Sequence, residues 1–465
     1  MNQSQIQLFD HKKPIKLQAE RVSFFQQAKI IEAYSENNEV YYLFFYKNRF
    51  LTAAKTTKLR RQSYIEQALK EGIVINSPHP LINQLLATNF PCQIINFKQL
   101  LKKLATHFTP QENAFILTFF ESFFPRQQLF DEIKSKFYEY RRNGQMYLAY
   151  QIVRILMDFV PNHSLVKTLA NDKNFNKYAG LYEKESEEIF AKDLLFYEKT
   201  MFLQKENDQS FQQLVTLMKK ESRWMDMIAL YLYKLTLTPS VQYYTPLLIL
   251  LKQHFKQVDI EIILEELSCQ LPSYLPLQQD LLEMYVKNRE IEKFFTIINR
   301  SNFQISNSHI PAFRDMLEHL DTTGSYSLEP EMLTNFLIPI IQLYPEDAEK
   351  LLKTSVISLL KTHDLAYLKK WLDQLKGTHE QLQIFEEIDT MHSYSEDLDR
   401  MQELGELYYK FRQWEKAIEC FSWEMELHPT DPKPLQWLSK VYRKMGMNQE
   451  SETYLQLCVN LKKWA

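Results

Sequence analysis

The chain has 465 residues, of which 45% are hydrophobic and 24% charged, and its formal net charge is −3. These values are typical of a folded protein, so they exclude a wholly disordered chain, and the length exceeds what one compact core usually contains. Glycine is scarce, with 7 residues in the chain, which argues against folds that depend on tight glycine turns or glycine-rich phosphate loops. We therefore expect long helices joined by short polar or proline-containing turns.

The N-terminal segment has a different pattern from the rest of the chain. Short runs rich in β-branched and aromatic residues alternate there with polar turn segments, which is typical of hairpin-connected strands. These runs are residues 15–17, 29–33, 40–46 and 50–54. We predict a small antiparallel β module over residues 1–62, covered by a helix that begins near Arg60.

This segment is also basic. Residues 1–70 hold 12 lysines and arginines against 6 aspartates and glutamates, a net charge of +6, and the remainder carries −9. Cations interleaved with aromatic residues such as Tyr46 and Phe50 can bind phosphate and stack on bases. Lysines along a strand edge that prevent aggregation explain the same pattern. Both interpretations apply to the basic residues Lys47, Arg49, Lys55, Lys58, Arg60 and Arg61.

From residue 63 onward the apolar residues follow helical spacing. The pair Thr109-Pro110 suits a helix start, because proline fits the first turn and threonine caps it. Aromatic residues then recur every four positions, at Phe115, Phe119 and Phe123. This spacing predicts a stripe buried against a neighbouring element, and a peptide-docking face is the alternative interpretation.

The clearest pattern lies in residues 398–465. Its first half contains Leu404, Gly405, Tyr408, Ala417, Phe421 and Pro429. Thirty-four residues further along, corresponding positions hold Leu438, Ser439, Tyr442, Ser451 and Leu455. A leucine, a small residue, a tyrosine, a second small residue and a bulky apolar residue at this period resemble the tetratricopeptide repeat family.

The resemblance implies two helix pairs in residues 398–465. Gly405 and Ser439 would let the second helix of each pair approach, and Phe421 and Leu455 would fill the space between helices. Weaker echoes occur upstream, at Phe137, Tyr140, Gly144, Ala149, Val153 and Pro161. We therefore expect an all-α fold: an irregular tetratricopeptide-like helical solenoid, degenerate over residues 63–397, with a small β-rich N-terminal module.

In this family the first helix of each repeat lines a concave groove that holds peptides. The resemblance assigns that role to Gln402, Glu406, Tyr409, Lys433, Gln436, Lys440 and Arg443. Lys440 and Arg443 resemble the basic residues with which some members hold a terminal carboxylate. The asparagines usual to that clamp are missing here, and solvated surface cations are the alternative interpretation.

Motifs of catalysis and metal binding are absent from the sequence. It contains no G-x-G-x-x-G, G-x-x-x-x-G-K-[ST], G-x-S-x-G or H-E-x-x-H pattern. The 11 histidines and 4 cysteines are not spaced as metal ligands. The carboxylate clusters at 386–389 and 396–399 are typical of solvated helix ends. We expect a protein that is not an enzyme and that binds no cofactor or metal.

The N-terminus has no apolar signal-peptide core, and the widely separated cysteines suit reduced thiols, so we predict a cytoplasmic protein without membrane contact. The leading hypothesis is an interaction scaffold or regulatory adaptor that binds a protein or peptide on its concave helical surface. The alternatives are a nucleic-acid-associated regulator that uses the basic N-terminal module, and a sensor of small peptides. Self-association through the C-terminal helix is a further hypothesis, and it concerns Leu457, Leu461 and Trp464.

Overall fold

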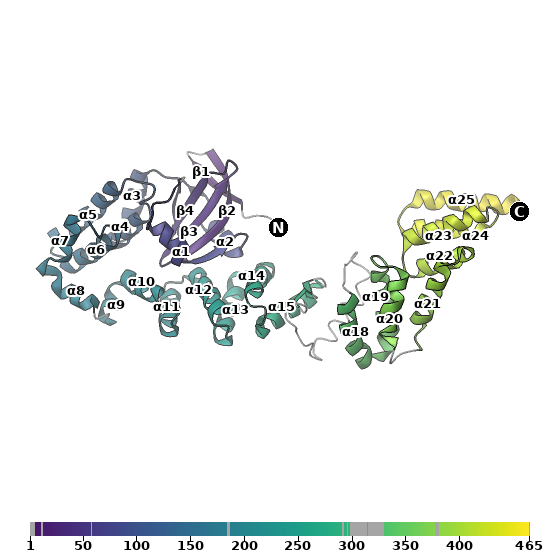
Figure 1. The fold of residues 1–465 in the computed structure, drawn as a ribbon. Coiled ribbons are helices and arrows are strands. Elements are labelled where there is room, and N and C mark those ends of the chain that lie inside the picture. Colours follow the sequence, from purple (N-terminus) through teal and green to yellow (C-terminus); the bar gives the residue numbers. More distant parts are fainter. Residues whose placement is uncertain are drawn as a thin grey trace. The chain divides into compact units, whose positions relative to one another are not determined.

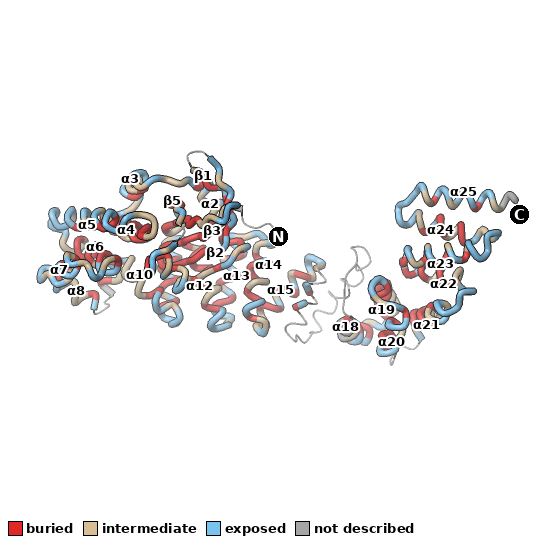
Figure 2. Tube along the Cα trace, turned by 45° about the horizontal axis from the view of Figure 1, so that its top comes forward, coloured by how far each residue is buried: buried red, intermediate tan, exposed pale blue. Residues whose placement is uncertain are grey.

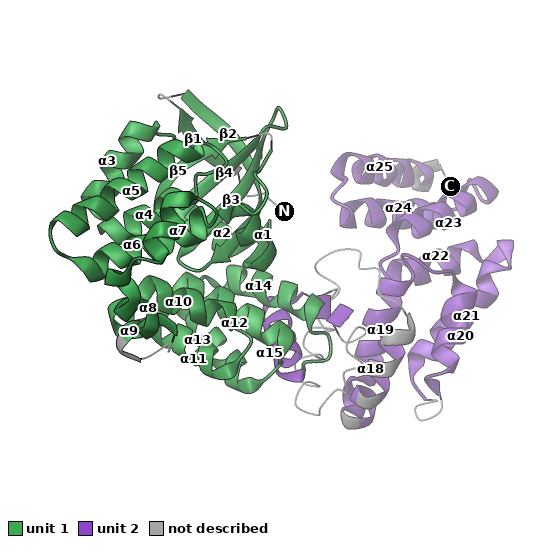
Figure 3. Ribbon diagram, turned by 60° about the vertical axis from the view of Figure 1, so that its left-hand side comes forward, with its two compact units in different colours: residues 1–274 green, residues 275–465 purple. Residues whose placement is uncertain are grey.

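The fold is that of a computed structural model (Figure 1). The residues that it describes are 5–10, 13–56, 58–183, 187–290, 293–294, 296–297, 314, 330–376 and 381–464. The chain divides into two compact units, unit 1 (residues 1–274) and unit 2 (residues 275–465), shown in Figure 3. Both units contain buried apolar residues along their helices, so each has a core of its own (Figure 2).

Unit 1 begins with a seven-stranded sheet in the order β5-β4-β3-β2-β1-β7, with β6 paired to β2 beside β1. The strands are β1 (Gln5–Asp10), β2 (Lys13–Phe25), β3 (Ala28–Ser35), β4 (Val40–Tyr46), β5 (Arg49–Lys55), β6 (Ile73–Asn76) and β7 (Cys92–Gln93). All pairings are antiparallel except that of β1 with β7. The predicted strands are therefore present, and β1, β6 and β7 are additional.

The sheet extends beyond the predicted boundary at residue 62. Helices α1 (Tyr64–Glu71), α2 (Pro80–Thr88) and α3 (Phe97–His107) alternate with the last two strands. Residues of this segment also bond to the edge strand β5. The amide oxygen of Asn89 accepts from the Phe50 amide at 2.8 Å, and Lys103 Nζ donates to the carbonyls of Phe50 and Leu51 at 2.9 Å. These bonds occupy backbone groups that an open edge would offer to another chain.

The central strands are buried on both faces, because consecutive residues such as Ile30, Ile31, Leu43, Phe44 and Phe45 are all fully buried. Their continuous apolar runs match a sheet covered on both sides rather than one with a wet face.

Part of this cover comes from the predicted aromatic stripe on and after α4 (Pro110–Thr118), a helix that Thr109 caps through a reciprocal bond with Glu112. The rings of Phe44 and Phe120 lie 4.6 Å apart, and those of Tyr64 and Phe119 4.3 Å apart. The stripe is thus a core element of unit 1.

The rest of unit 1 is helical. Its elements are α5 (Arg126–Arg142), α6 (Met146–Phe159), α7 (Ser164–Ala170), η1 (Lys173–Phe175), α8 (Asn176–Glu183), α9 (Glu187–Lys192), α10 (Leu194–Leu203), α11 (Asp208–Lys220), α12 (Trp224–Leu237), α13 (Val241–His254) and α14 (Gln257–Gln270). Short turns join consecutive helices such as α5 and α6 or α11 and α12, which makes them antiparallel hairpins.

A buried ionic network joins the sheet to these helices. Lys29 of β3 donates to Asp226 Oδ2 at 2.6 Å and to the Lys47 carbonyl at 2.6 Å. Arg223, the residue before α12, donates to Glu198 of α10 at 2.8 Å and to Asp226 at 3.1 Å. The side chains of Lys29, Arg223, Asp226 and Glu198 are at most 2% exposed. Two cations and two carboxylates therefore balance one another in the interior, which satisfies charges that would otherwise be costly to bury.

Unit 2 is helical throughout its described residues. Its elements are α15 (Leu275–Asn288), α18 (Pro330–Leu343), η3 (Pro345–Asp347), α19 (Ala348–Leu359), α20 (Leu365–Asp373), α21 (Gln383–Ser395), η5 (Leu398–Arg400), α22 (Met401–Lys410), α23 (Trp414–Leu427), α24 (Pro432–Lys444) and α25 (Asn448–Trp464). In the described parts of both units, no helix is long and apolar enough to cross a membrane.

The last four helices form two hairpins, α22–α23 and α24–α25, at the positions expected from the 34-residue period. A Cβ atom added to Gly405 would lie 2.6 Å from the ring of Phe421, so only glycine fits there without a shift. At the equivalent place in the second hairpin, the Ser439 hydroxyl donates to the Ser451 carbonyl at 2.9 Å, and the Ser451 hydroxyl donates to the Ser439 carbonyl at 2.8 Å. Small residues thus permit the close approach in both hairpins.

The expectation for one core residue of these hairpins, Leu455, is wrong. Phe421 is fully buried and stacks on Trp437 of the next helix at 5.7 Å, but Leu455 is 52% exposed. Among the described residues nothing covers Leu455 as Trp437 covers Phe421, and α25 buries Ser451 and Cys458 instead.

Candidate functional site

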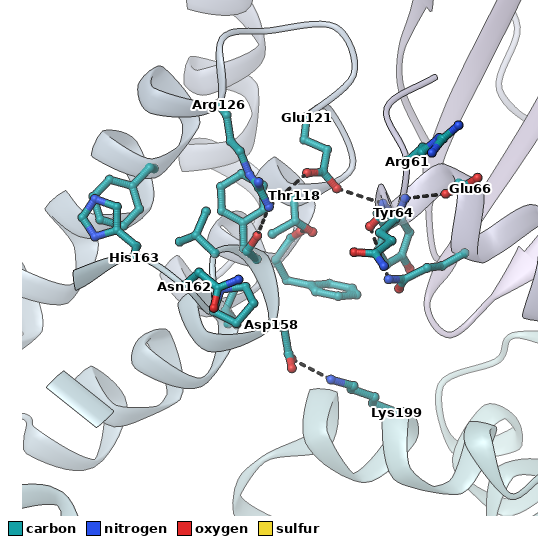
Figure 4. Close-up of a pocket in the computed structure, with 18 of the residues that line it drawn as sticks. Arg61, Tyr64, Glu66, Thr118, Glu121, Arg126, Asp158, Asn162, His163 and Lys199 are labelled. Atoms are coloured by element: carbon teal, nitrogen blue, oxygen red, sulfur yellow. Dashed lines mark hydrogen bonds and ion pairs between the residues drawn. The ribbon is translucent and has the colours of Figure 1, made fainter. Parts of the chain in front are cut away.

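Unit 1 contains a cleft of about 770 Å³, within the size range of ligand sites. Its walls are α1 on one side, α4 and the turn after it, α5, and the end of α6 with the following loop, and Lys199 of α10 reaches it from below (Figure 4). The β module and the helical hairpins thus build it together. Phe115, Phe130 and Phe159 contribute to the apolar part of its lining, together with aliphatic residues such as Ile155.

Most charges around the cleft are paired with one another. Lys70 Nζ lies 3.1 Å from Glu66 of the same helix, and Lys199 Nζ lies 2.6 Å from Asp158 of α6. In total four lysine or arginine side chains and four carboxylates line the cleft. The formal charges balance, so the cleft as a whole attracts neither polyanions nor polycations.

Glu121, in the turn between α4 and α5, is buried, unlike the other carboxylates that line the cleft (Figure 4). The residue is 5% exposed, and its Oε1 accepts from the Tyr64 amide at 3.0 Å. Its Oε2 lies 3.7 Å from Arg126 Nη2, beyond hydrogen-bond distance, because Arg126 donates to the Phe159 carbonyl instead. No described residue donates a hydrogen bond to Oε2. Burial raises the pKa of Glu121, and neither the Tyr64 amide nor Arg126 compensates fully.

The predicted peptide-binding residues lie on one face of α22 and α24. Gln402 Nε2 donates to Glu406 at 2.8 Å, and Tyr409 meets Trp437 of α24 edge-on at 5.1 Å. Lys440 Nζ lies 4.1 Å from the centre of the Trp437 ring. Residues Lys433, Gln436, Lys440 and Arg443 recur along α24 at helical spacing, so they share this face.

Several cations of unit 2 form ion pairs, whereas those on the predicted face of α24 form none within the described part of the chain. Lys369 and Lys376 pair with Asp389, and Lys410 pairs with Glu387. In contrast, no ion pair joins Lys433, Lys440 or Arg443 to any residue that the structure describes, and all three are exposed. Trp437, which repeat spacing did not single out, lies among them and is half-buried.

The basic residues of the N-terminal segment do not form one uniform patch. Lys47 lies 2.8 Å from Glu221 and 3.6 Å from Glu112, and Lys55 pairs with Glu39. The remaining four are exposed and form no ion pair within the described parts of the chain; they are Arg49, Lys58, Arg60 and Arg61.

The cleft could not be predicted from the sequence, because the residues that line it come from segments far apart in the chain. One signal for Glu121 does exist. It is the single carboxylate in the apolar run 114–124, where a charged residue indicates burial with a special role or partner.

No family model matches the chain, and no curated protein matches it either. Function must therefore be argued from the two surfaces themselves, the cleft of unit 1 and the basic face of α24.

Proposed function

We propose that this protein is a non-enzymatic interaction scaffold of the cytoplasm that binds an acidic protein segment on the exposed face of α22 and α24. In this proposal the helical hairpins form an irregular solenoid of the tetratricopeptide type. The close contacts at Gly405 and between Ser439 and Ser451 support the repeat assignment, because small residues meet there at the expected period. Repeat folds serve many processes, so the role must come from the face itself.

The observation that carries the proposal is the combination of free cations and aromatic rings on this face. Lys433, Lys440 and Arg443 have no carboxylate partner among the described residues, so carboxylates of a partner can pair with them without displacing another ion. Trp437 lies between Lys433 and Lys440 along α24, Tyr409 of α22 contacts it, and both rings offer surface to an apolar side chain. Aromatic residues and arginine are the side chains that most often dominate binding energy at interfaces.

The test is fluorescence polarisation with labelled acidic peptides that contain one aromatic residue, each made with a free and with an amidated C-terminus. Charge reversal of Lys440 and Arg443 to glutamate should weaken binding about tenfold or more, since two charge-assisted contacts are lost. The matched control reverses Lys219 and Lys220, exposed at the end of α11. Equal affinity of the K440E/R443E variant and the wild type would reject the proposal. A preference for the free carboxylate would identify a terminal rather than an internal segment.

The alternative, a nucleic-acid-associated regulator, rests on Arg49, Lys58, Arg60 and Arg61, the basic N-terminal residues without an ion-pair partner among the described residues. Because Lys47 and Lys55 are neutralised by carboxylates, fewer cations are available for phosphate than the sequence suggested. A gel shift at low salt that Arg60→Ala and Arg61→Ala abolish would favour this role. If neither RNA nor DNA is shifted at low salt, this role is excluded.

A further inference from the structure

The cleft of unit 1 combines three features that are independent of the α24 face. It has the volume of a ligand site, Phe115 and Phe159 are among the residues that line it, and it contains one buried carboxylate whose second oxygen has no hydrogen-bond donor among the described residues. That carboxylate, Glu121, is 5% exposed, so only a small part of its surface is open to water in the cleft.

We propose that this cleft binds an organic cation, a primary ammonium or guanidinium group, which donates to Glu121 Oε2 and lies against the aromatic rings of the wall. A buried carboxylate is stabilised most by a charged donor, because charge-assisted hydrogen bonds are about twice as strong as neutral ones. Aromatic faces add attraction for the same group. The raised pKa of Glu121 agrees with a carboxylate that lacks full compensation.

Arg126 does not fill this role itself. Its guanidinium is held by the Phe159 carbonyl and lies 5.2 Å from the centre of the Phe159 ring, which leaves Nη2 3.7 Å from Glu121 Oε2. The arrangement shows that this wall accommodates a guanidinium on an aromatic ring beside the carboxylate. It also means that Arg126 opposes a ligand cation by like charge.

The same chemistry is available from two sources, a basic side chain of a peptide or a free small amine. Suitable probes are Nα-acetyl-arginine amide, the peptide Gly-Arg-Gly with both ends capped, and agmatine. Nα-acetyl-citrulline amide is the neutral counterpart, since it keeps the shape of the side chain and loses the charge. Saturation-transfer difference NMR on the full chain measures the affinity of such weak ligands by titration.

Two substitutions at the site should change affinity in opposite directions. Glu121→Gln keeps an oxygen for the Tyr64 amide and removes the charge, so the arginine probes should bind about tenfold more weakly or worse. Arg126→Gln removes the opposing cation and should strengthen binding, by up to about fivefold. Glu139→Gln, an exposed position on α5 away from the cleft, is the matched control and should leave affinity unchanged.

Stronger binding of the capped peptide than of agmatine would support a peptide source, and the reverse order would support a free amine. The proposal is overturned if citrulline amide binds as well as arginine amide, or if Glu121→Gln and Glu139→Gln have equal effects. Absence of binding by the wild type to every cationic probe overturns it as well. None of these outcomes bears on the face of α22 and α24, which lies in unit 2 and is tested with acidic peptides.

Discussion

Lys29 and Asp226 form the closest ion pair of the buried network in unit 1, with Nζ 2.6 Å from Oδ2 and side chains that are 0% and 2% exposed. Replacing Lys29 by methionine leaves the network of Arg223, Asp226 and Glu198 with one uncompensated negative charge. Asp226→Asn leaves one uncompensated positive charge. Removing one partner of a buried pair typically costs about 3–5 kcal/mol of unfolding free energy.

The double variant restores the charge balance, so its destabilisation should be about 2–3 kcal/mol smaller than the sum of the two single effects. The pKa of Lys29 indicates why the Lys29–Asp226 pair adds little net free energy of unfolding. Burial lowers this pKa from 10.5 to about 8, although Asp226 raises it. The folded state therefore holds the charged ammonium about 3 kcal/mol less favourably than the unfolded chain does.

The lowered pKa also predicts a pH dependence. Between pH 8 and pH 10.5 the unfolded chain binds a proton at Lys29 that the folded protein has released, so stability attributable to this group rises with pH across that window. Below pH 8 the burial penalty is present in full. The stability of the wild type relative to Lys29→Met should therefore increase as the pH is raised from 8 to 10.5.

Trp224 provides a specific probe, because it is the only tryptophan in residues 1–274 and it directly follows Arg223. Incorporation of 5-fluorotryptophan gives it a ¹⁹F resonance of its own, which Trp224→Phe assigns. Urea titration followed at this resonance then measures the unfolding of unit 1 for the wild type, both single variants and the double variant. Single effects that add to within about 0.5 kcal/mol in the double variant would refute the coupling.

Three further changes test other contacts. Gly405→Val should lower the unfolding free energy by about 1–3 kcal/mol, because a side chain there meets the ring of Phe421. Gly180→Ala, which has open space around it, should raise the unfolding free energy by about 0.5–1 kcal/mol. Thermal denaturation compares the two variants with the wild type. Lys103→Met should speed amide hydrogen exchange in β5, because it removes the bonds to the carbonyls of Phe50 and Leu51. Lys102→Met, a change at the exposed neighbouring residue, should not. Equal exchange rates in the two variants would contradict the role of Lys103 at the edge strand. Glu121→Gln should raise the unfolding free energy at neutral pH, because the raised pKa of the Glu121 carboxyl means that its ionisation opposes folding. This gain should shrink as the pH falls. A difference in urea midpoint between the variant and the wild type that stays constant with pH would refute the reasoning.

Sequence patterns predicted those features that depend on local spacing. The cap at Thr109-Pro110, the strands over 40–46 and the helix turns in the last hairpins all follow from residues a few positions apart. The tetratricopeptide resemblance implied the close approach at Gly405, and the ring of Phe421 does lie against that residue. Side-chain periodicity does not show whether another element packs against a residue. The expectation that Leu455 lies in the core was wrong for that reason.

The tetratricopeptide resemblance named the members of the predicted peptide face, which lie at helical spacing on neighbouring helices, and their partner stays a prediction. The cleft and the ionic network could not be named. Lys29 and Asp226 are 197 positions apart, and nothing near either residue indicates a partner of opposite charge. Glu121 likewise meets Tyr64 across 57 positions.

The sequence by itself determined the type of those elements whose side-chain spacing is regular, such as the strand over 40–46 and the helices of the last two hairpins, because their type depends on backbone preference and on the spacing of side chains within one element. Only the tertiary structure decided that β6 and β7 complete the sheet, that Lys29 is buried as an ion pair, and that Glu121 borders a cleft. These features depend on which elements pack together, and desolvation and charge pairing act on whatever that packing brings into contact.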